Sequence, residues 1–325
     1  MISSSDAAHG LSRTRESQDV IVIVGATATG KSAVGIEVAL RVGGEIVSAD
    51  SRAFFRKMDI LTDKPSRAAQ RRVPHHLLSI CSIGDSYDAM RFRQDADQVI
   101  RSILHRNRVP VVVGGGTLYV AAIIEGLFQG PSADPALRSE LSQRSTDELH
   151  SMLRRVDPVS AERIHPHDRL RVVRALEVHR KTGKAISRLQ DHAAPLDYAF
   201  HGFVLARPRD DHRRAIAERV DHMISAGLVD EVEALRDAGL RSNMQAYRTI
   251  GIPEALSFLD GEIDDHELRE RLVNRTWALA RRQTAWFRRL HGFRRLDVGT
   301  MSAGEVAQEV TRQLSDFVPF SKEAL

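Results

Sequence analysis

The sequence predicts an α/β fold, in which a parallel β-sheet is flanked by helices and interrupted by an all-helical insertion. Residues 20–24 are five consecutive β-branched residues, and further short, mainly apolar runs that we expect to be strands occupy residues 45–48, 77–80 and 109–113. Apolar residues at helical spacing occupy residues 33–42 and 88–105. Short apolar runs that alternate with helical patterns are typical of buried parallel strands in α/β proteins.

The insertion is predicted from a break in this alternation at residues 131–198. Apolar residues there recur at helical spacing with few strand signals, and a strand pattern returns at residues 201–205. We therefore expect one α/β core and one helical insertion, with polar residues 1–19 as a disordered tail. The expected core segments are 20–130 and 199–297, the insertion is 131–198, and the C-terminal tail is 298–325.

Composition restricts the class of protein. Of 325 residues, 42% are hydrophobic, which is ample for a core, and 47 basic against 43 acidic residues give a net charge of only +4. Any argument for nucleic-acid binding must therefore rest on where the charge lies. The single cysteine, Cys81, excludes an internal disulfide and favours the cytoplasm. No apolar run is long enough for a membrane span.

The first strand runs directly into a phosphate-binding motif, G-x-x-x-x-G-K-[ST], and a helical pattern follows it. Its glycines allow the backbone to approach an anion, its lysine supplies a positive charge, and its serine hydroxyl is placed to ligate Mg²⁺. The fold is therefore expected to be of the P-loop NTPase type. The motif is formed by Gly25, Ala26, Thr27, Ala28, Thr29, Gly30, Lys31 and Ser32.

Asp50 follows the second predicted strand and is the candidate general base. Ligands of parallel sheets bind at the carboxyl ends of the strands, so Asp50 should face the same crevice as the phosphate loop. Taken alone, this segment fits a turn or helix-capping aspartate equally well. A second glycine turn, residues 114–116, follows the strand at 109–113 and should face that crevice too.

The long segment 52–76 is predicted to be a functional loop, since structureless connections of this length are uncommon. Its Thr62, Asp63 and Lys64 are positioned to reach a bound phosphate or to lie in solvent. We predict no zinc site at its histidine pair, because no second pair stands at ligand spacing.

Two later stretches carry informative charge. Arg219 lies among apolar positions of a helix at 207–226, so its charge requires an anion, either a protein carboxylate or a diphosphate. From residue 271 to 296 there are eight arginines and no acidic residue, interleaved with Trp277, Trp286 and Phe287. This one-signed helix favours contact with a polyanion over a solvated surface. Segment 163–188 is also basic, and there contact with a nucleic-acid backbone and a solvated helix surface are equally good interpretations.

The chain resembles the bacterial tRNA dimethylallyltransferase family over about residues 20–297. The matching stretches are GATATGKS, IVSADSR, MDILTDKP, PHHLL, GGGTLYV and the later RRQTAWFR. The sequence departs from the usual family pattern at a few positions, which are Ala26, Gly116, Leu170, Ala215, Ile252 and Pro253.

The resemblance implies transfer of a dimethylallyl group from its diphosphate to the exocyclic N6 amine of the adenosine on the 3′ side of the tRNA anticodon. It implies that Asp50, Arg219 and Lys31 are catalytic, that the phosphate loop with Arg219 binds the diphosphate, and that Mg²⁺ binds at Ser32. The expected partners are the tRNA anticodon stem-loop and dimethylallyl diphosphate, and the expected state is a monomer. The implied RNA-binding residues are Asp50, Ser51, Arg52, Ala53, Gly116, Thr117, Arg138, Leu170, Arg171, Val172, Val173, Arg174, Arg248, Arg281, Arg282, Gln283 and Arg288.

Two other enzymes share part of this pattern. An adenylate isopentenyltransferase would prenylate free AMP, ADP or ATP, but it has no use for a long basic helix and a helical insertion. A small-molecule kinase would use the same loop for ATP and Asp50 as its base. A non-catalytic RNA-binding module would leave both the phosphate loop and Asp50 unexplained.

Overall fold

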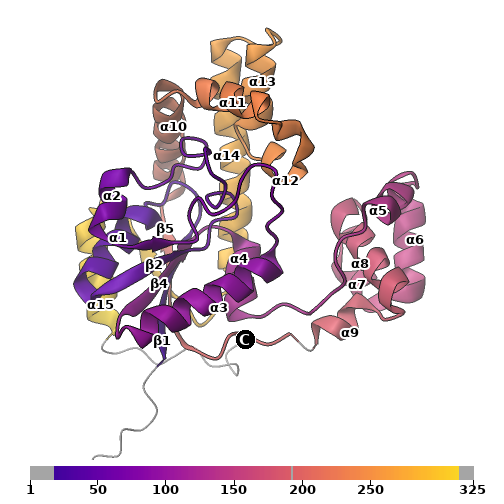
Figure 1. The fold of residues 1–325 in the computed structure, drawn as a ribbon, viewed down its shortest axis with the longest axis horizontal. Helices are drawn as coiled ribbons and strands as arrows, with labels where there is room; N and C mark the ends of the chain where they lie inside the picture. The colour runs from indigo at the N-terminus through magenta and orange to yellow at the C-terminus, as the bar shows by residue number, and fades with distance from the viewer. Residues whose placement is uncertain (1–17, 192, 315–325) are drawn as a thin grey trace, which may run out of the picture.

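The computed structural model describes residues 18–191 and 193–314, which form an α/β core and a helical insert beside it (Figure 1). The core contains a six-stranded sheet in the order β3-β2-β4-β1-β5-β6, and every neighbouring pair is parallel. The predicted parallel sheet is therefore confirmed. The strands are β1 (Asp19–Gly25), β2 (Gly44–Ser48), β3 (His75–His76), β4 (Val109–Gly114), β5 (Ala199–Ala206) and β6 (Arg294–Asp297).

Alternating side chains of β1 divide the core into two layers. Ile21 and Ile23 pack on one face of the sheet with α1 and α15, whereas Val20, Val22 and Val24 pack on the other. Because successive side chains of a strand point to opposite faces, an entirely apolar strand must be covered on both sides. The helices that cover the two faces are α1 (Lys31–Val42), α15 (Ala303–Leu314), α3 (Ala89–His105), α4 (Thr117–Ile124) and α14 (Asp265–Phe287).

The last described helix, α15, was expected within a C-terminal tail. It instead packs against α1, and its Val306 and Val310 are buried in the core. Residues 1–19 were expected to be a disordered tail, but Asp19 already begins β1. Residues 1–17 and the final residues 315–325 lie outside the described part of the chain.

The insert is all-helical, as predicted. Figure 1 shows it to one side of the sheet, joined to the core by two extended segments between α4 and α5 and between α9 and β5. It has its own apolar core, which includes Leu149, Leu153 and Leu176. Its helices are α5 (Pro135–Ser142), α6 (Thr146–Val156), α7 (Pro158–Arg163), α8 (Arg169–Thr182) and α9 (Ile186–Gln190).

The remaining helices were incompletely predicted. A helix at 207–226 was expected and is present as α10, but the elements between it and α14 were not placed from the sequence. The helical elements not yet named are α2 (Arg67–Arg72), α10 (Arg209–Ser225), α11 (Leu228–Asp237), η1 (Leu240–Ser242), α12 (Met244–Tyr247) and α13 (Ile252–Leu259).

A strand expected at residues 77–80 is wrong. The chain pairs with β2 earlier, through His75 and His76, and then turns away. Leu77 and Ser79 have φ angles of 61° and 52°, which an extended strand does not allow. Within the described residues, no helix is both long and apolar enough to cross a membrane.

Candidate active site

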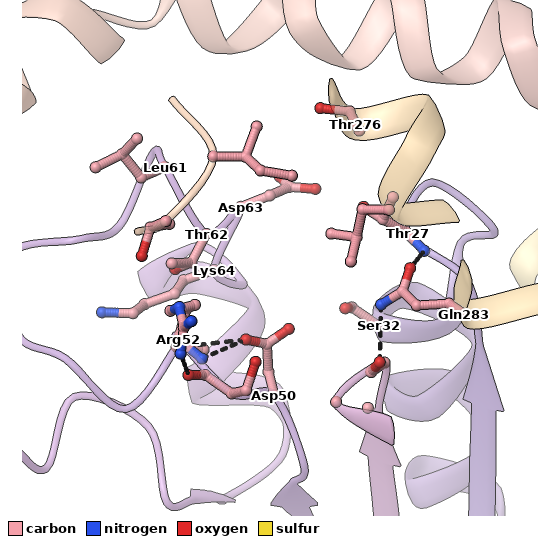
Figure 2. A pocket seen from close by; sticks show the side chains of 18 of the residues that line it. Thr27, Ser32, Asp50, Arg52, Leu61, Thr62, Asp63, Lys64, Thr276 and Gln283 are labelled. Carbon is pink, nitrogen blue, oxygen red and sulfur yellow. Dashed lines mark hydrogen bonds between the residues drawn. The ribbon is translucent and has the colours of Figure 1, made fainter. Parts of the chain in front are cut away.

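The carboxyl ends of β1, β2 and β4 open into a cavity of about 500 Å³. Thr27, Lys31 and Ser32 line it from the phosphate loop, and Asp50 lines it from the segment after β2. Figure 2 shows Asp50, Arg52 and Lys64 on one side of this cavity and Thr27, Ser32 and Gln283 on the other. The structure therefore brings the predicted phosphate loop and the predicted base into one site.

The phosphate loop has the backbone that anion binding requires. Gly30 adopts a left-handed conformation, with φ 81°, immediately before α1 begins at Lys31. This turn places the first amides of α1 at the end of the loop, and Ser32 lines the cavity. The Lys31 Nζ donates a hydrogen bond to the Ala26 carbonyl oxygen at 3.3 Å. Burial and the nearby Arg219 charge lower the pKa of Lys31 to about 8, an effect that Asp50 and Asp63 partly offset.

The two carboxylate oxygens of Asp50 have different surroundings. Its Oδ1 accepts hydrogen bonds from the backbone amides of Arg52, at 2.8 Å, and Ala53, at 3.1 Å, so the carboxylate shapes the turn after β2. Its Oδ2 makes no hydrogen bond to any described residue, and Asp50 lines the cavity. One carboxylate oxygen is therefore structural, while the other is available to a ligand.

Gln283 connects the two glycine turns. Its Oε1 accepts a hydrogen bond from the Thr27 amide at 2.9 Å, and its Nε2 donates to the Gly115 carbonyl oxygen at 2.7 Å. A Cβ atom at Gly115 would lie 2.9 Å from that Nε2 and 3.2 Å from the Lys31 Cε. A side chain at 115 would press on Gln283 and Lys31, so glycine lets the second turn approach the phosphate loop and α14 closely. The expectation that both glycine turns face one crevice is confirmed.

Arg219 has a carboxylate partner within the cavity. Its Nη1 lies 3.0 Å from the Asp63 Oδ2, in a pair of which the aspartate is half exposed. This is the protein partner that the position of Arg219 among apolar residues of α10 required. The sequence left open whether Asp63 reaches a bound phosphate or lies in solvent; it lines the cavity, although its side chain is half exposed.

The loop that carries Asp63 is held rigidly by two residues. The Glu231 carboxylate accepts hydrogen bonds from three successive amides, those of Asp59, Ile60 and Leu61, at 2.8 to 2.9 Å. Lys64 points into the protein, where its Nζ contacts the Phe55 carbonyl oxygen and Asp59. Lys64 is therefore structural in this state. Glu231 was not predicted, since only the tertiary fold places α11 beside residues 59–61.

The predicted RNA-binding residues of the core mostly surround the same cavity. Ala53 is buried, Arg52 is partly exposed and Arg248 is exposed. Sequence analysis missed Arg275 and Thr276, which line the cavity from α14. The predicted residues that line it are Asp50, Ser51, Arg52, Ala53, Gly116, Thr117, Arg248, Arg282 and Gln283. Arg281 and Arg288 do not, because they line a separate cavity on another face of α14.

The predicted RNA-binding residues of the insert fall into two groups. Arg138 and Arg174 both pair with Glu177, whose side chain is fully buried, at 2.8 Å and 2.5 Å. Val172 and Val173 are buried in the core of the insert, so they position α8 and do not present a surface to a ligand. Leu170, by contrast, is 69% exposed, and Arg171 is exposed beside it.

The fold and the cavity define a class of protein. A phosphate loop, a carboxylate with one available oxygen and a cluster of arginines belong to a P-loop-type α/β enzyme that binds a phosphorylated substrate. Among the described residues, no group of three or more histidine, cysteine, aspartate or glutamate side chains is arranged to hold a metal ion.

Comparison with known proteins specifies the family. The model of the IPP transferase family matches residues 53–290. The tRNA dimethylallyltransferase of Thermotoga petrophila is 41% identical over 273 residues, which are 83% of this chain and 89% of that protein. The Pelotomaculum thermopropionicum tRNA dimethylallyltransferase is 39% identical over 310 residues, 93% of this chain and 98% of that protein. The chain belongs to the IPP transferase family.

Solved structures agree with this assignment. The full-length tRNA isopentenylpyrophosphate transferase of Bacillus halodurans matches with a TM-score of 0.69 and 32% identity, covering 92% of this chain and 96% of that one. A eukaryotic dimethylallyltransferase acting on tRNA matches with a TM-score of 0.80 over 95% of this chain and 82% of that one. Its identity of 24% supports the shared fold alone.

Proposed function

We propose that this protein transfers a dimethylallyl group from dimethylallyl diphosphate to the exocyclic N6 amine of the adenosine on the 3′ side of a tRNA anticodon. The observation that carries the proposal is the shared cavity, in which a phosphate loop and the free Oδ2 of Asp50 face each other in a chain of the IPP transferase family. The reaction forms a carbon–nitrogen bond, breaks the allylic carbon–oxygen bond, and releases diphosphate and one proton.

The leaving diphosphate is stabilised by positive groups that converge on the loop. As the carbon–oxygen bond breaks, negative charge grows on the diphosphate and positive charge on the allylic carbon. Loop amides, Lys31 and Arg219 are positioned to bind the growing negative charge, and preorganised groups of this kind supply much of enzymatic rate enhancement. Arg219 then either leaves Asp63 to pair with the diphosphate or contacts both.

The proton of the adenine amine is taken by Asp50. Its Oδ1 is fixed by the amides of Arg52 and Ala53, which hold the carboxylate in place while Oδ2 accepts the proton. The target base must be unstacked to reach a cavity at the ends of the strands, as in other base-modifying enzymes. Arg52, Arg248 and Arg282 line the cavity and would contact the RNA around that base.

The site suits a Mg²⁺ ion that is held mainly by the phosphates of the substrate. Ser32 offers a hydroxyl at the start of α1, and the structure provides no carboxylate cage in its described residues. Mg²⁺ commonly binds through one or two protein oxygens, substrate phosphates and water, where it neutralises phosphate charge. Ser32 would hold it there, beside Lys31.

The test is a transfer assay with labelled dimethylallyl diphosphate and Mg²⁺, offered unmodified tRNA, AMP or ATP in separate reactions. We expect label in tRNA alone, and loss of transfer on removal of Mg²⁺ with a chelator. Label in AMP or ATP would indicate the nucleotide enzyme instead. Consumption of ATP without prenyl transfer would indicate a kinase. We also propose a monomeric active unit, since one chain supplies every residue of the site.

A further inference from the structure

A second cavity, of about 420 Å³, lies against another face of the phosphate loop and of α14. It is lined by Ala26 and Thr29 of the loop, whereas the active-site cavity is lined by Thr27, Lys31 and Ser32. On α14 its lining residues recur at helical spacing and face away from Thr276, Leu279 and Gln283. These residues are Trp277, Arg281, Thr284 and Arg288.

The lining of this cavity is strongly positive. Five arginines contribute to it, and no aspartate or glutamate does. Across residues 18–191 and 193–314, none of the five forms a salt bridge, whereas Arg219 and Arg275 of the active-site cavity each pair with a carboxylate. The five are Arg207, Arg209, Arg281, Arg288 and Arg295.

Two of these arginines are held in place by the main chain and leave charge unmatched. Arg207 donates from Nη1 to the Gly299 carbonyl oxygen at 3.1 Å, and Arg295 donates from Nη2 to that of Phe287 at 3.1 Å. The Nε of Arg207 is buried and has no acceptor. A buried donor without an acceptor is destabilising, so a ligand oxygen at this point would be favourable.

We propose that this cavity is a second phosphate-binding site, separate from the site for the leaving diphosphate. Guanidinium groups match phosphate oxygens in pairs, and several of them without carboxylate partners favour a multiply charged phosphate or successive backbone phosphates. The phosphate comes either from the RNA backbone or from a free phosphorylated molecule. The first source rests on the proposed function, and the second is independent of it.

Occupancy of the second site would be coupled to the catalytic loop through His212. This histidine lines the second cavity, and its Nε2 donates to the Thr27 carbonyl oxygen at 2.8 Å. The Thr27 amide donates to Gln283, which lines the active-site cavity. Hydrogen bonds from residues of both cavities therefore hold Thr27 in place. A ligand that orders His212 therefore acts directly on a residue of the phosphate loop.

The experiment uses the full-length Arg209→Ala/Arg295→Ala double variant, because both side chains are exposed and neither contributes to the active-site cavity. The matched control is Arg67→Ala/Arg71→Ala, which removes two exposed arginines of α2 that line neither cavity. Inorganic pyrophosphate is titrated calorimetrically, and unmodified tRNA is titrated over a KCl series. Thermal melting confirms folding, and Arg209→Ala alone replaces the double variant if that variant unfolds.

A free phosphorylated ligand predicts two pyrophosphate-binding events in the wild type and in the control, and one in the double variant. A backbone phosphate predicts one event in all three, with the salt slope of tRNA binding smaller by about 1–2 in the double variant than in the control. Pyrophosphate and tRNA binding that both match the control would overturn the proposal. If the wild type bound no pyrophosphate at all, that result would count against the diphosphate site of the proposed function. The tRNA series would then still decide whether the second cavity binds phosphate.

Discussion

The guanidinium of Arg219 lies 3.0 Å from the carboxylate of Asp63, inside the cavity that faces the phosphate loop. A diphosphate bound to the loop therefore meets an arginine that already has a partner. Glu231 and Lys64 fix the backbone on either side of Asp63, so the carboxylate cannot move far without rearranging its loop. Under the proposed function, Asp63 would therefore compete with the diphosphate for Arg219.

Replacing Asp63 should strengthen diphosphate binding. Because the pair is partly exposed, we expect Asp63→Asn to bind inorganic pyrophosphate about two- to fivefold more tightly, with stronger product inhibition. Calorimetric titration measures the affinity. Arg219→Ala is the control, because it removes the cation itself and should bind pyrophosphate more weakly. Weaker binding by Asp63→Asn would show that the carboxylate supports the ligand, for example by holding a cation.

Replacing Asp50 should slow turnover without weakening diphosphate binding. Asp50→Asn keeps an oxygen for the amides of Arg52 and Ala53 but loses the proton acceptor, so it separates the structural role from the chemical one. We expect kcat to fall by about 10²–10⁴-fold, with KM for dimethylallyl diphosphate nearly unchanged. Single-turnover transfer to tRNA measures this, and wild-type rates in Asp50→Asn would exclude Asp50 as the base.

The pKa of Lys31, lowered to about 8 by burial and by Arg219, predicts a pH dependence. Binding of diphosphate needs the charged lysine, so kcat/KM for dimethylallyl diphosphate should fall as pH rises through about 8. Removing Arg219 removes a repulsive charge, so its alanine variant should move this limb to higher pH. Asp63→Asn removes an attractive charge and should move the limb to lower pH. Shifts in the reverse directions would reject Lys31 as the titrating group.

Gln283 should act on both glycine turns at once. Gln283→Ala leaves the Thr27 amide and the Gly115 carbonyl group without their partners, and we expect kcat/KM to fall by about tenfold. Gln245→Ala is the matched control, because Gln245 bridges the backbone of Tyr87 in the same way outside the cavity. Equal losses of activity in the two variants would attribute the effect to general destabilisation.

Glu177 should stabilise the insert. Its pKa is lowered to about 2 because hydrogen bonds from Arg138, the Asp134 amide and Arg174 outweigh burial. We expect Glu177→Gln to lower the free energy of unfolding by about 2–4 kcal/mol at pH 7. Because the folded pKa lies below the ordinary value of 4.5, the difference from wild type should shrink as pH falls from 4.5 to 2.

Glu140→Gln, which removes an exposed partner of Arg180 in the same insert, is the control and should cost less than about 1 kcal/mol. Unfolding is followed by circular dichroism as a function of denaturant. A difference that persists unchanged at pH 2.5 would mean that ionisation of Glu177 does not contribute.

The sequence predicted correctly those parts of the fold whose own residues show a clear strand, loop or helix pattern. The β-branched run of β1, the phosphate loop after it and the apolar spacing of α1 predicted strand, loop and helix in their observed places. The elements between α10 and α14 were not placed; of these, η1 and α12 have only three and four residues, too few to show a helical period. The strand expected at 77–80 failed because left-handed residues there have no glycine to mark them.

The sequence by itself determined which chemistry this protein offers: a phosphate loop, a carboxylate at the end of a strand and arginines at helical spacing. Tertiary structure alone decided how those groups are partnered. Asp63 faces Arg219, Gln283 joins two turns that are 88 residues apart, and Glu177 occupies two of the predicted RNA-binding arginines. The physical reason is that side-chain hydrogen bonds and ion pairs depend on distances in space, while a sequence pattern records only spacing along one element.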